Sequence, residues 1–170
     1  MQTIKRPIPT VLLAWFAMLG VDFFLHGGLL AGFYFVASPF LLPPMDAFVR
    51  IPLGYSGFLL MAVLLVWILP RFNIANWKEA FWFGIKLGAL VWGGFALGLI
   101  SISTIDTSLA VAWFLGQTLE LGIGAVVAER ASNATSLRRI TWFVFLSVFL
   151  AIGLTVALQS SGLVPTVRIQ

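Results

Sequence analysis

TVLLAWFAMLGVDFFLHGGLLAGFYF (residues 10–35) is apolar, aromatic or glycine at almost every position. A helix needs about 20 predominantly apolar residues to cross the hydrocarbon of a bilayer. The chain offers one such segment here and four more, which we predict at Ile51–Leu69, Glu79–Ile100, Thr107–Ala128 and Ile140–Gln159. No alternating strand pattern competes, and helices and closed barrels are the only backbone structures that lipid permits. We therefore predict an all-α bundle of five transmembrane helices.

The composition supports the same class of protein. The chain has 170 residues, of which 61% are hydrophobic and 9% are charged, whereas a soluble domain carries about 25% charged residues. This leaves too little polar surface to cover a soluble fold, so we predict one integral membrane domain over residues 1–170, surrounded by lipid. The ten basic residues are scattered at the ends of segments, which argues against nucleic acid as a partner.

The basic residues in short loops predict the orientation, because cytoplasmic loops are enriched in Lys and Arg. One side of the predicted bundle would collect seven of them, and the other side two, Arg50 and Arg168. The seven are Lys5, Arg6, Arg71, Lys78, Arg130, Arg138 and Arg139. We predict a cytoplasmic N-terminus and an external C-terminus. The first segment is too long for the apolar region of a signal peptide, which has about 7–15 residues.

Several kinds of chemistry find no support in the sequence. The chain has no Cys and one His, which excludes thiolate sites and a multi-histidine metal site within one protomer. We predict no metal site. The phosphate-binding, dinucleotide-binding, HExxH and GxSxG patterns are absent from the chain, so we predict no enzymatic activity.

Five polar side chains within the apolar segments are the candidate functional residues. They are Asp22, His26, Lys86, Gln117 and Glu120. Ionisable groups in hydrocarbon are costly and mark functional sites by default. Lys86 and Glu120 would both lie roughly 12 Å from the inner ends of their helices, so we predict that they pair, while Asp22 joins them or bonds His26 on its own helix face.

Structural interpretations of these residues stand beside the functional ones. Lys86 could extend its ammonium group to the interface, and the pair of Lys86 with Glu120 could hold two helices together without any turnover. His26 could be a hydrogen-bonded structural residue, a ligand to a metal or pigment centre, or part of a proton relay. The sequence leaves these alternatives open.

Small residues at regular spacing predict close helix packing, because they let backbones approach each other. The predicted packing positions are Gly28, Gly32, Gly84, Gly88, Gly94, Gly98, Gly116 and Gly124. The fifth segment carries no ionisable residue. We expect it at the periphery of the bundle, against lipid or a partner subunit, with the four earlier segments forming the polar core.

Three stretches carry a resemblance to a group of proteins. They are DFFLHGGLLAGFY (22–34), KEAFWFGIKLGALVWGG (78–94) and SLAVAWFLGQTLELGIGAVVA (108–128). Together they resemble small bacterial inner-membrane proteins of unknown function, over roughly residues 10–130, and this chain departs from them by its fifth segment. The matching positions, in a D-x-x-x-H-G and an A-W-F-x-G-x-x-x-E pattern, are Asp22, His26, Gly27, Trp113, Gly116 and Glu120. The resemblance implies a multi-pass fold in the bacterial inner membrane and no particular activity.

Three functions fit these features. The leading hypothesis is a non-enzymatic accessory or assembly subunit of a membrane complex, with other membrane subunits or further copies of the chain as partners. The second is a proton-coupled or small-solute transporter or channel lined by Asp22, His26, Lys86 and Glu120. The third is a subunit that binds a lipid, quinone or pigment, with His26 as the ligand.

Overall fold

The structure is a computed structural model that describes residues 4, 6–34, 39–74 and 76–165. All secondary structure in these ranges is helical. The elements are α1 (Pro7–Phe24), the π-helix η1 (Leu25–Leu29), the 3₁₀-helix η2 (Ala31–Tyr34), α2 (Pro44–Ile68), the 3₁₀-helix η3 (Leu69–Phe72), α3 (Trp77–Ile102), α4 (Thr107–Asn133) and α5 (Arg138–Ser160). Five of these helical segments are long and apolar enough to cross a membrane. The all-helical class and the five apolar helices are thus confirmed.

The observed bounds differ from the predicted ones at two places that matter for the site. The α-helix of the first segment ends at Phe24 and continues as a π-helix only to Leu29; Phe35, the predicted end, lies outside the described residues. Helix α4 continues to Asn133 instead of Ala128. Glu120 is therefore the central residue of α4, about 20 Å from each end by the helical rise. Lys5 and Arg168 also lie outside the described residues.

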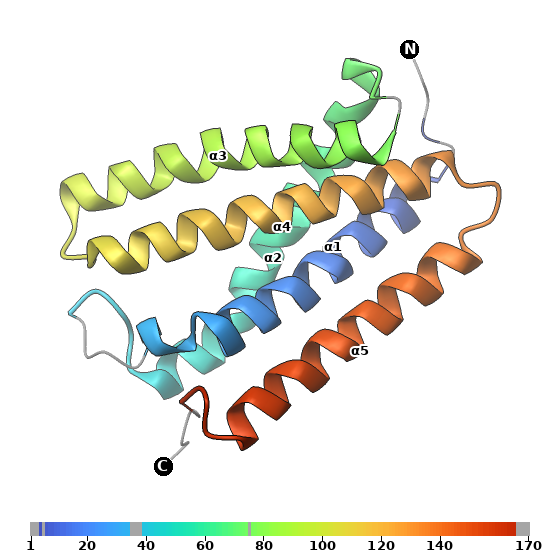
Figure 1. Ribbon diagram of the computed structural model, residues 1–170. Helices are drawn as coiled ribbons and strands as arrows, with labels where there is room; N and C mark the ends of the chain where they lie inside the picture. The colour runs from blue at the N-terminus through green and yellow to red at the C-terminus, as the bar shows by residue number, and fades with distance from the viewer. Residues whose placement is uncertain (1–3, 5, 35–38, 75, 166–170) are drawn as a thin grey trace.

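The five helices run alternately in opposite directions (Figure 1). Helices α3, α4, α1 and α5 lie side by side in that order, and α2 crosses behind α4 and α1. Helix α4 packs against both α3 and α1, which makes it the central element of the row. Helices α3 and α5 are the two edges. The expected peripheral place of the fifth segment fits this arrangement, and α3 is equally peripheral.

Side chains cap the two helices that make the closest pair. Asn76 accepts hydrogen bonds from the backbone N–H groups of Lys78 and Glu79 at the start of α3, and its amide donates to Glu79. Asp106 accepts from the N–H groups of Ser108 and Leu109 at the start of α4. The Ser108 hydroxyl also donates to Asp106, and these bonds lower the pKa of that carboxyl group. Both caps satisfy backbone donors that have no partner within the helix.

Two glycines set the distance between α3 and α4. A Cβ atom at Gly84 would lie 2.4 Å from the carbonyl oxygen of Leu121, and one at Gly88 would lie 2.8 Å from Cα of Thr118. Both obstacles are backbone atoms, so no side-chain rotation could relieve the contact. The predicted packing role of these two glycines therefore corresponds to a real close approach of the helices.

Replacing Gly84 with Ala should destabilise the bundle by about 1–3 kcal/mol, because the added methyl group forces α3 away from α4. This loss should exceed the gain of about 1 kcal/mol that alanine brings to a helix. Unfolding in detergent measures the change. Gly94→Ala on the same helix is the control, since a Cβ atom there meets nothing within 4 Å. Equal stability of the two variants would contradict the prediction.

Candidate functional site

Three ionisable side chains from α1, η1 and α4 meet inside the bundle. The Nε2 atom of His26 lies 3.5 Å from Oε1 of Glu120 and 3.8 Å from Oδ1 of Asp22. The side chains of Asp22 and His26 are 15% and 13% exposed, and that of Glu120 is fully buried. The Asp22–His26–Glu120 cluster therefore consists of two carboxyl groups and one imidazole, and it is largely buried in the protein.

The carboxyl group of Glu120 makes no hydrogen bond to any residue that the structure describes. Within the described part of the chain, neither of its buried side-chain oxygens has a hydrogen-bond partner, and the same is true of Nε2 of His26. The separations of 3.5 and 3.8 Å exceed the 2.7–3.2 Å of an N–H···O hydrogen bond. A buried carboxylate without a partner is costly. The cluster therefore favours the entry of positive charge, as a proton or as another small cation.

The π-helix η1 carries His26 to this place. The Leu30 N–H donates to the carbonyl oxygen of Leu25, one residue further back than in an α-helix. This wider turn leaves backbone carbonyls in need of other partners. The side-chain amide of Gln159 on α5 donates to the carbonyl of Gly27 over 2.8 Å. Helix α5 thus supports the local distortion next to His26, a role that its sequence did not reveal.

Tyr34 and Trp113 fix the other side of the imidazole. The indole Nε1 of Trp113 donates to the hydroxyl oxygen of Tyr34, and that oxygen lies 2.5 Å from Nδ1 of His26. Trp is a donor only, so the hydrogen of the tyrosine is free to point at Nδ1. We assign the neutral imidazole the tautomer with its hydrogen on Nε2. That hydrogen then faces the two carboxyl groups.

Gly116 provides the room for the imidazole. A Cβ atom at this position would lie 2.9 Å from Nε2 and 3.1 Å from Cε1 of His26. Gly116 stands one helical turn before Glu120 on α4, so the glycine and the carboxyl group face the same ring. Gly124, one turn further along, makes the same kind of room for Met18, whose Sδ atom would be 2.7 Å from a Cβ.

Lys86 does not join the cluster. It is exposed, and no ion pair links it to Glu120 among the described residues. Gly84 and Gly88 face α4, and a residue two positions from each of them lies on the opposite side of the helix. Lys86 is also about 13 Å from the start of α3, so it does not match the depth of Glu120. The predicted pair of Lys86 with Glu120 is not formed.

The remaining predicted positions have smaller roles in this geometry. Gln117 has a buried Oε1 without a hydrogen-bond partner, and no hydrogen bond joins its side chain to the cluster in the described part of the chain. Gly28 makes ordinary contacts, with Thr155 Oγ1 and a Leu158 methyl group 3.6 Å from a Cβ. A Cβ atom at Gly32, Gly94 or Gly98 would meet nothing within 4 Å among the described residues, so the predicted packing role of these three glycines has no counterpart here.

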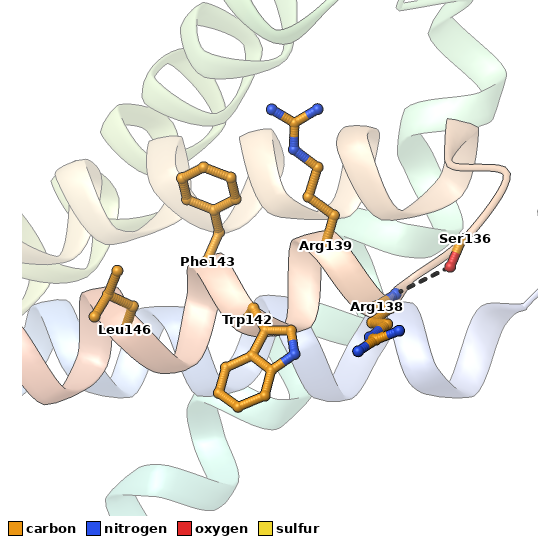
Figure 2. A pocket seen from close by; sticks show the side chains of 6 residues that line it. All are labelled: Ser136, Arg138, Arg139, Trp142, Phe143 and Leu146. Carbon is orange, nitrogen blue, oxygen red and sulfur yellow. Dashed lines mark hydrogen bonds between the residues drawn. The ribbon is translucent and has the colours of Figure 1, made fainter.

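Two hollows on the surface lie apart from the cluster. One, of about 520 Å³, lies on the outer side of α5, where Figure 2 shows arginines and aromatic rings beside one another. Its lining residues are Ser136, Arg138, Arg139, Trp142, Phe143 and Leu146. The other, of about 680 Å³, separates α4 from α5 and reaches from Arg130 and Arg139 to Val21. Neither is lined by the three cluster residues.

The sequence missed the support around His26. Tyr34 and Gln159 were not recognised as its neighbours, and Trp113 appeared only as a matching position of the resemblance. A signal for Trp113 was present, since Trp113, Gly116 and Glu120 follow the i, i+3, i+7 spacing of one helix face.

Comparison of the chain with family models, curated proteins and solved structures finds no match. The resemblance to small bacterial inner-membrane proteins therefore stays a prediction.

Proposed function

We propose that this chain is a non-enzymatic, multi-pass membrane protein that binds a small cation at the Asp22–His26–Glu120 cluster and transfers it through the bundle. The observation that carries the proposal is the state of Glu120, which is fully buried and has no hydrogen bond to either oxygen from any residue that the structure describes. A buried carboxylate in that state is stabilised by a bound positive charge. This is the transport alternative of the sequence analysis, without Lys86.

Insertion in a membrane is supported by the outer faces of the edge helices. Leu90 and Ile102 on α3 and Trp142 and Leu146 on α5 are each at least two-thirds exposed. A soluble protein rarely leaves such continuous apolar faces uncovered. The central position of Glu120 in α4 would place the cluster near the middle of the bilayer. A cation bound there would be halfway across.

The orientation rests on the basic residues. Among the described residues, those at the ends where α1, α3 and α5 begin are Arg6, Arg71, Lys78, Arg130, Arg138 and Arg139, whereas Arg50 lies at the opposite end. By the positive-inside rule the first end is cytoplasmic, with the N-terminus inside and the C-terminus outside. The aromatic rings and arginines of Figure 2 suit the lipid–water interface at that end. Location in a bacterial inner membrane rests on the resemblance alone.

Ion flux into vesicles tests the proposal. The full chain is reconstituted with a trapped dye that reports protons or divalent cations, and a membrane potential drives uptake. We expect flux well above that of protein-free vesicles and a fall of at least about tenfold in Asp22→Asn. Glu129→Gln is the matched control, because Glu129 is also a buried carboxyl group of α4 but bonds Asn133 and lies outside the cluster. Equal flux in the two variants, or flux no higher than in protein-free vesicles, would refute it.

A role as a subunit of a larger membrane complex is the second candidate, and Lys86 favours it. This side chain is exposed on α3, about 13 Å from the start of the helix. A charge at that depth is costly against lipid, so an acidic group of another subunit or of a second copy would stabilise it. Copurification from native membranes, compared between Lys86→Leu and the wild-type chain, would reveal a partner lost with the charge.

The pigment or quinone alternative is less well supported by the geometry. His26 Nδ1 faces the Tyr34 hydroxyl and Nε2 faces two carboxyl groups. A planar ligand on the imidazole would have to displace one of these neighbours. An absorption spectrum of the purified protein would test it directly.

A further inference from the structure

We propose that the Asp22–His26–Glu120 cluster binds one divalent first-row transition metal ion, through Nε2 of His26 and one oxygen from each carboxyl group. This inference rests on the proposed function and names the chemical class of its cation. The three ligand atoms lie within 4.8 Å of one another. The single His excluded a multi-histidine site, and no metal site was predicted, although a metal centre stayed among the alternatives for His26. A set of one imidazole and two carboxylates needs only that one His.

The spacing of the ligand atoms suits a metal ion better than direct hydrogen bonds. Metal bonds of 2.0–2.2 Å to nitrogen and oxygen place neighbouring ligands of a tetrahedral site about 3.3–3.5 Å apart. The distance between His26 Nε2 and Glu120 Oε1 is 3.5 Å, and that to Asp22 Oδ1 is 3.8 Å. Rotation of a carboxyl group about its terminal bond, which is soft, closes the remaining distance.

A divalent ion would balance the charge of the cluster when both carboxyl groups are ionised. Two carboxylates and a neutral imidazole carry a charge of two negative units, which one divalent cation cancels completely. A neutral site is the form that a low-dielectric bundle tolerates best. Two bound protons, one on each carboxyl group, would also leave the cluster neutral, so a divalent ion competes with the protonation of Asp22 and Glu120. The imidazole selects against Mg²⁺ and Ca²⁺, which prefer oxygen ligands only, and favours ions such as Zn²⁺, Mn²⁺ or Fe²⁺.

The surroundings of His26 supply the outer support that such sites need. A metal-bound imidazole donates its other ring N–H to an acceptor, which fixes its orientation. Here the Tyr34 oxygen lies 2.5 Å from Nδ1 and already accepts from Trp113. When a metal ion takes Nε2, the ring hydrogen stands on Nδ1 instead. The Tyr34 hydroxyl then turns its own hydrogen away from the ring and accepts from Nδ1 with its second lone pair. Tyr34 is therefore a positioning residue for the site.

Equilibrium metal binding tests the inference independently of flux. The full chain is purified in detergent, stripped with a chelator, and titrated with Co²⁺ as a visible probe, followed by competition with Zn²⁺ and Mn²⁺. We expect one equivalent per chain with ligand-field bands. Affinity should fall at least about 100-fold in His26→Gln and Glu120→Gln, and roughly tenfold in Tyr34→Phe, which keeps all three ligands. Glu129→Gln should bind like the wild-type chain.

Each other outcome overturns the inference in a recognisable way. Folded wild-type protein that binds no metal, or that binds equally well in His26→Gln, excludes a site at this cluster. If proton flux that needs Asp22 continues in metal-free vesicles while no metal binds, the metal class is wrong and the proposed cation function stands. Stoichiometric binding without any flux has the opposite meaning, since it supports the metal site and refutes transfer. If a ligand variant fails to fold, the metal affinity of Tyr34→Phe still tests the inference, and an affinity equal to that of the wild-type chain would count against it.

Discussion

Glu120→Leu should leave the bundle as stable as the wild-type protein or more stable, by up to about 4 kcal/mol, while it abolishes cation binding and flux. The reason is the desolvation of a carboxyl group that receives no hydrogen bond in return. Replacing buried ionic groups with apolar side chains of similar volume is often neutral or stabilises by about 1–4 kcal/mol. The neutral tautomer that we assign to His26 means that no unpaired cation is left behind. Unfolding in detergent, followed by the flux assay, measures both effects.

The sign of the stability change decides between two roles of Glu120. If Glu120 and a charged His26 formed a structural ion pair, removing one partner would destabilise the bundle by about 3–5 kcal/mol. A loss of that size would contradict the functional assignment and support the interpretation of the cluster as a device for assembly. Glu129→Leu provides the comparison on the same helix. It removes a real hydrogen bond from Asn133, and it should therefore cost about 1 kcal/mol.

Gly116→Ala should lower cation affinity and flux about 100-fold with little change in stability. The new methyl group would lie 2.9 Å from Nε2 of His26, so the ring must move. The obstacle is the far end of a side chain, and such a group can rotate away at low cost in free energy. A displacement of about 1 Å is enough to cost a factor of roughly 100 in a positioned site. Metal titration and unfolding of the same sample measure the two quantities.

The control for this variant lies on α3. Gly94→Ala adds the same methyl group where nothing stands within 4 Å among the described residues. It should leave the affinity close to that of the wild-type chain and raise the stability by up to about 1 kcal/mol, the gain that alanine brings to a helix. Combination with His26→Gln gives a further check, because a second substitution that acts only through the imidazole should have no additional effect on affinity. Undiminished affinity in Gly116→Ala would mean that the ring position in the cluster does not matter for binding.

Much of the site could be predicted from the sequence because it depends on local spacing. Asp22 and His26 are four residues apart, so a helix brings them to one face. In the structure, Oδ1 of Asp22 lies 3.8 Å from Nε2 of His26. Glu120 follows Gly116 by one turn, which indicates a carboxyl group beside a close helix crossing. The place of Lys86 on the side of α3 that faces away from α4 could also have been predicted from the sequence. It stands between Gly84 and Gly88, and a face that packs through these glycines excludes a residue two positions away.

The partner of Glu120 could not be obtained in this way. Whether Glu120 meets His26 or Lys86 depends on how α4 is rotated between α1 and α3. This rotation is set by contacts between segments far apart in the chain. The change from α-helix to π-helix at Leu25 is equally non-local, because the Gln159 amide from the last helix satisfies the Gly27 carbonyl. The contact of Tyr34 with His26 follows from that change.

The sequence by itself determined that this chain forms five apolar helices with acidic and imidazole groups inside them, since the length of apolar runs, the caps at Asn76 and Asp106 and the i, i+4 spacing are local properties. Only the tertiary structure decided that α4 is the central helix and that Asp22, His26 and Glu120 meet. The physical reason is that close packing at Gly84, Gly88 and Gly116 fixes the rotation of α3 and α4 and the position of His26. At these glycines, atoms from distant parts of the sequence lie in direct contact, with no room for a further methyl group.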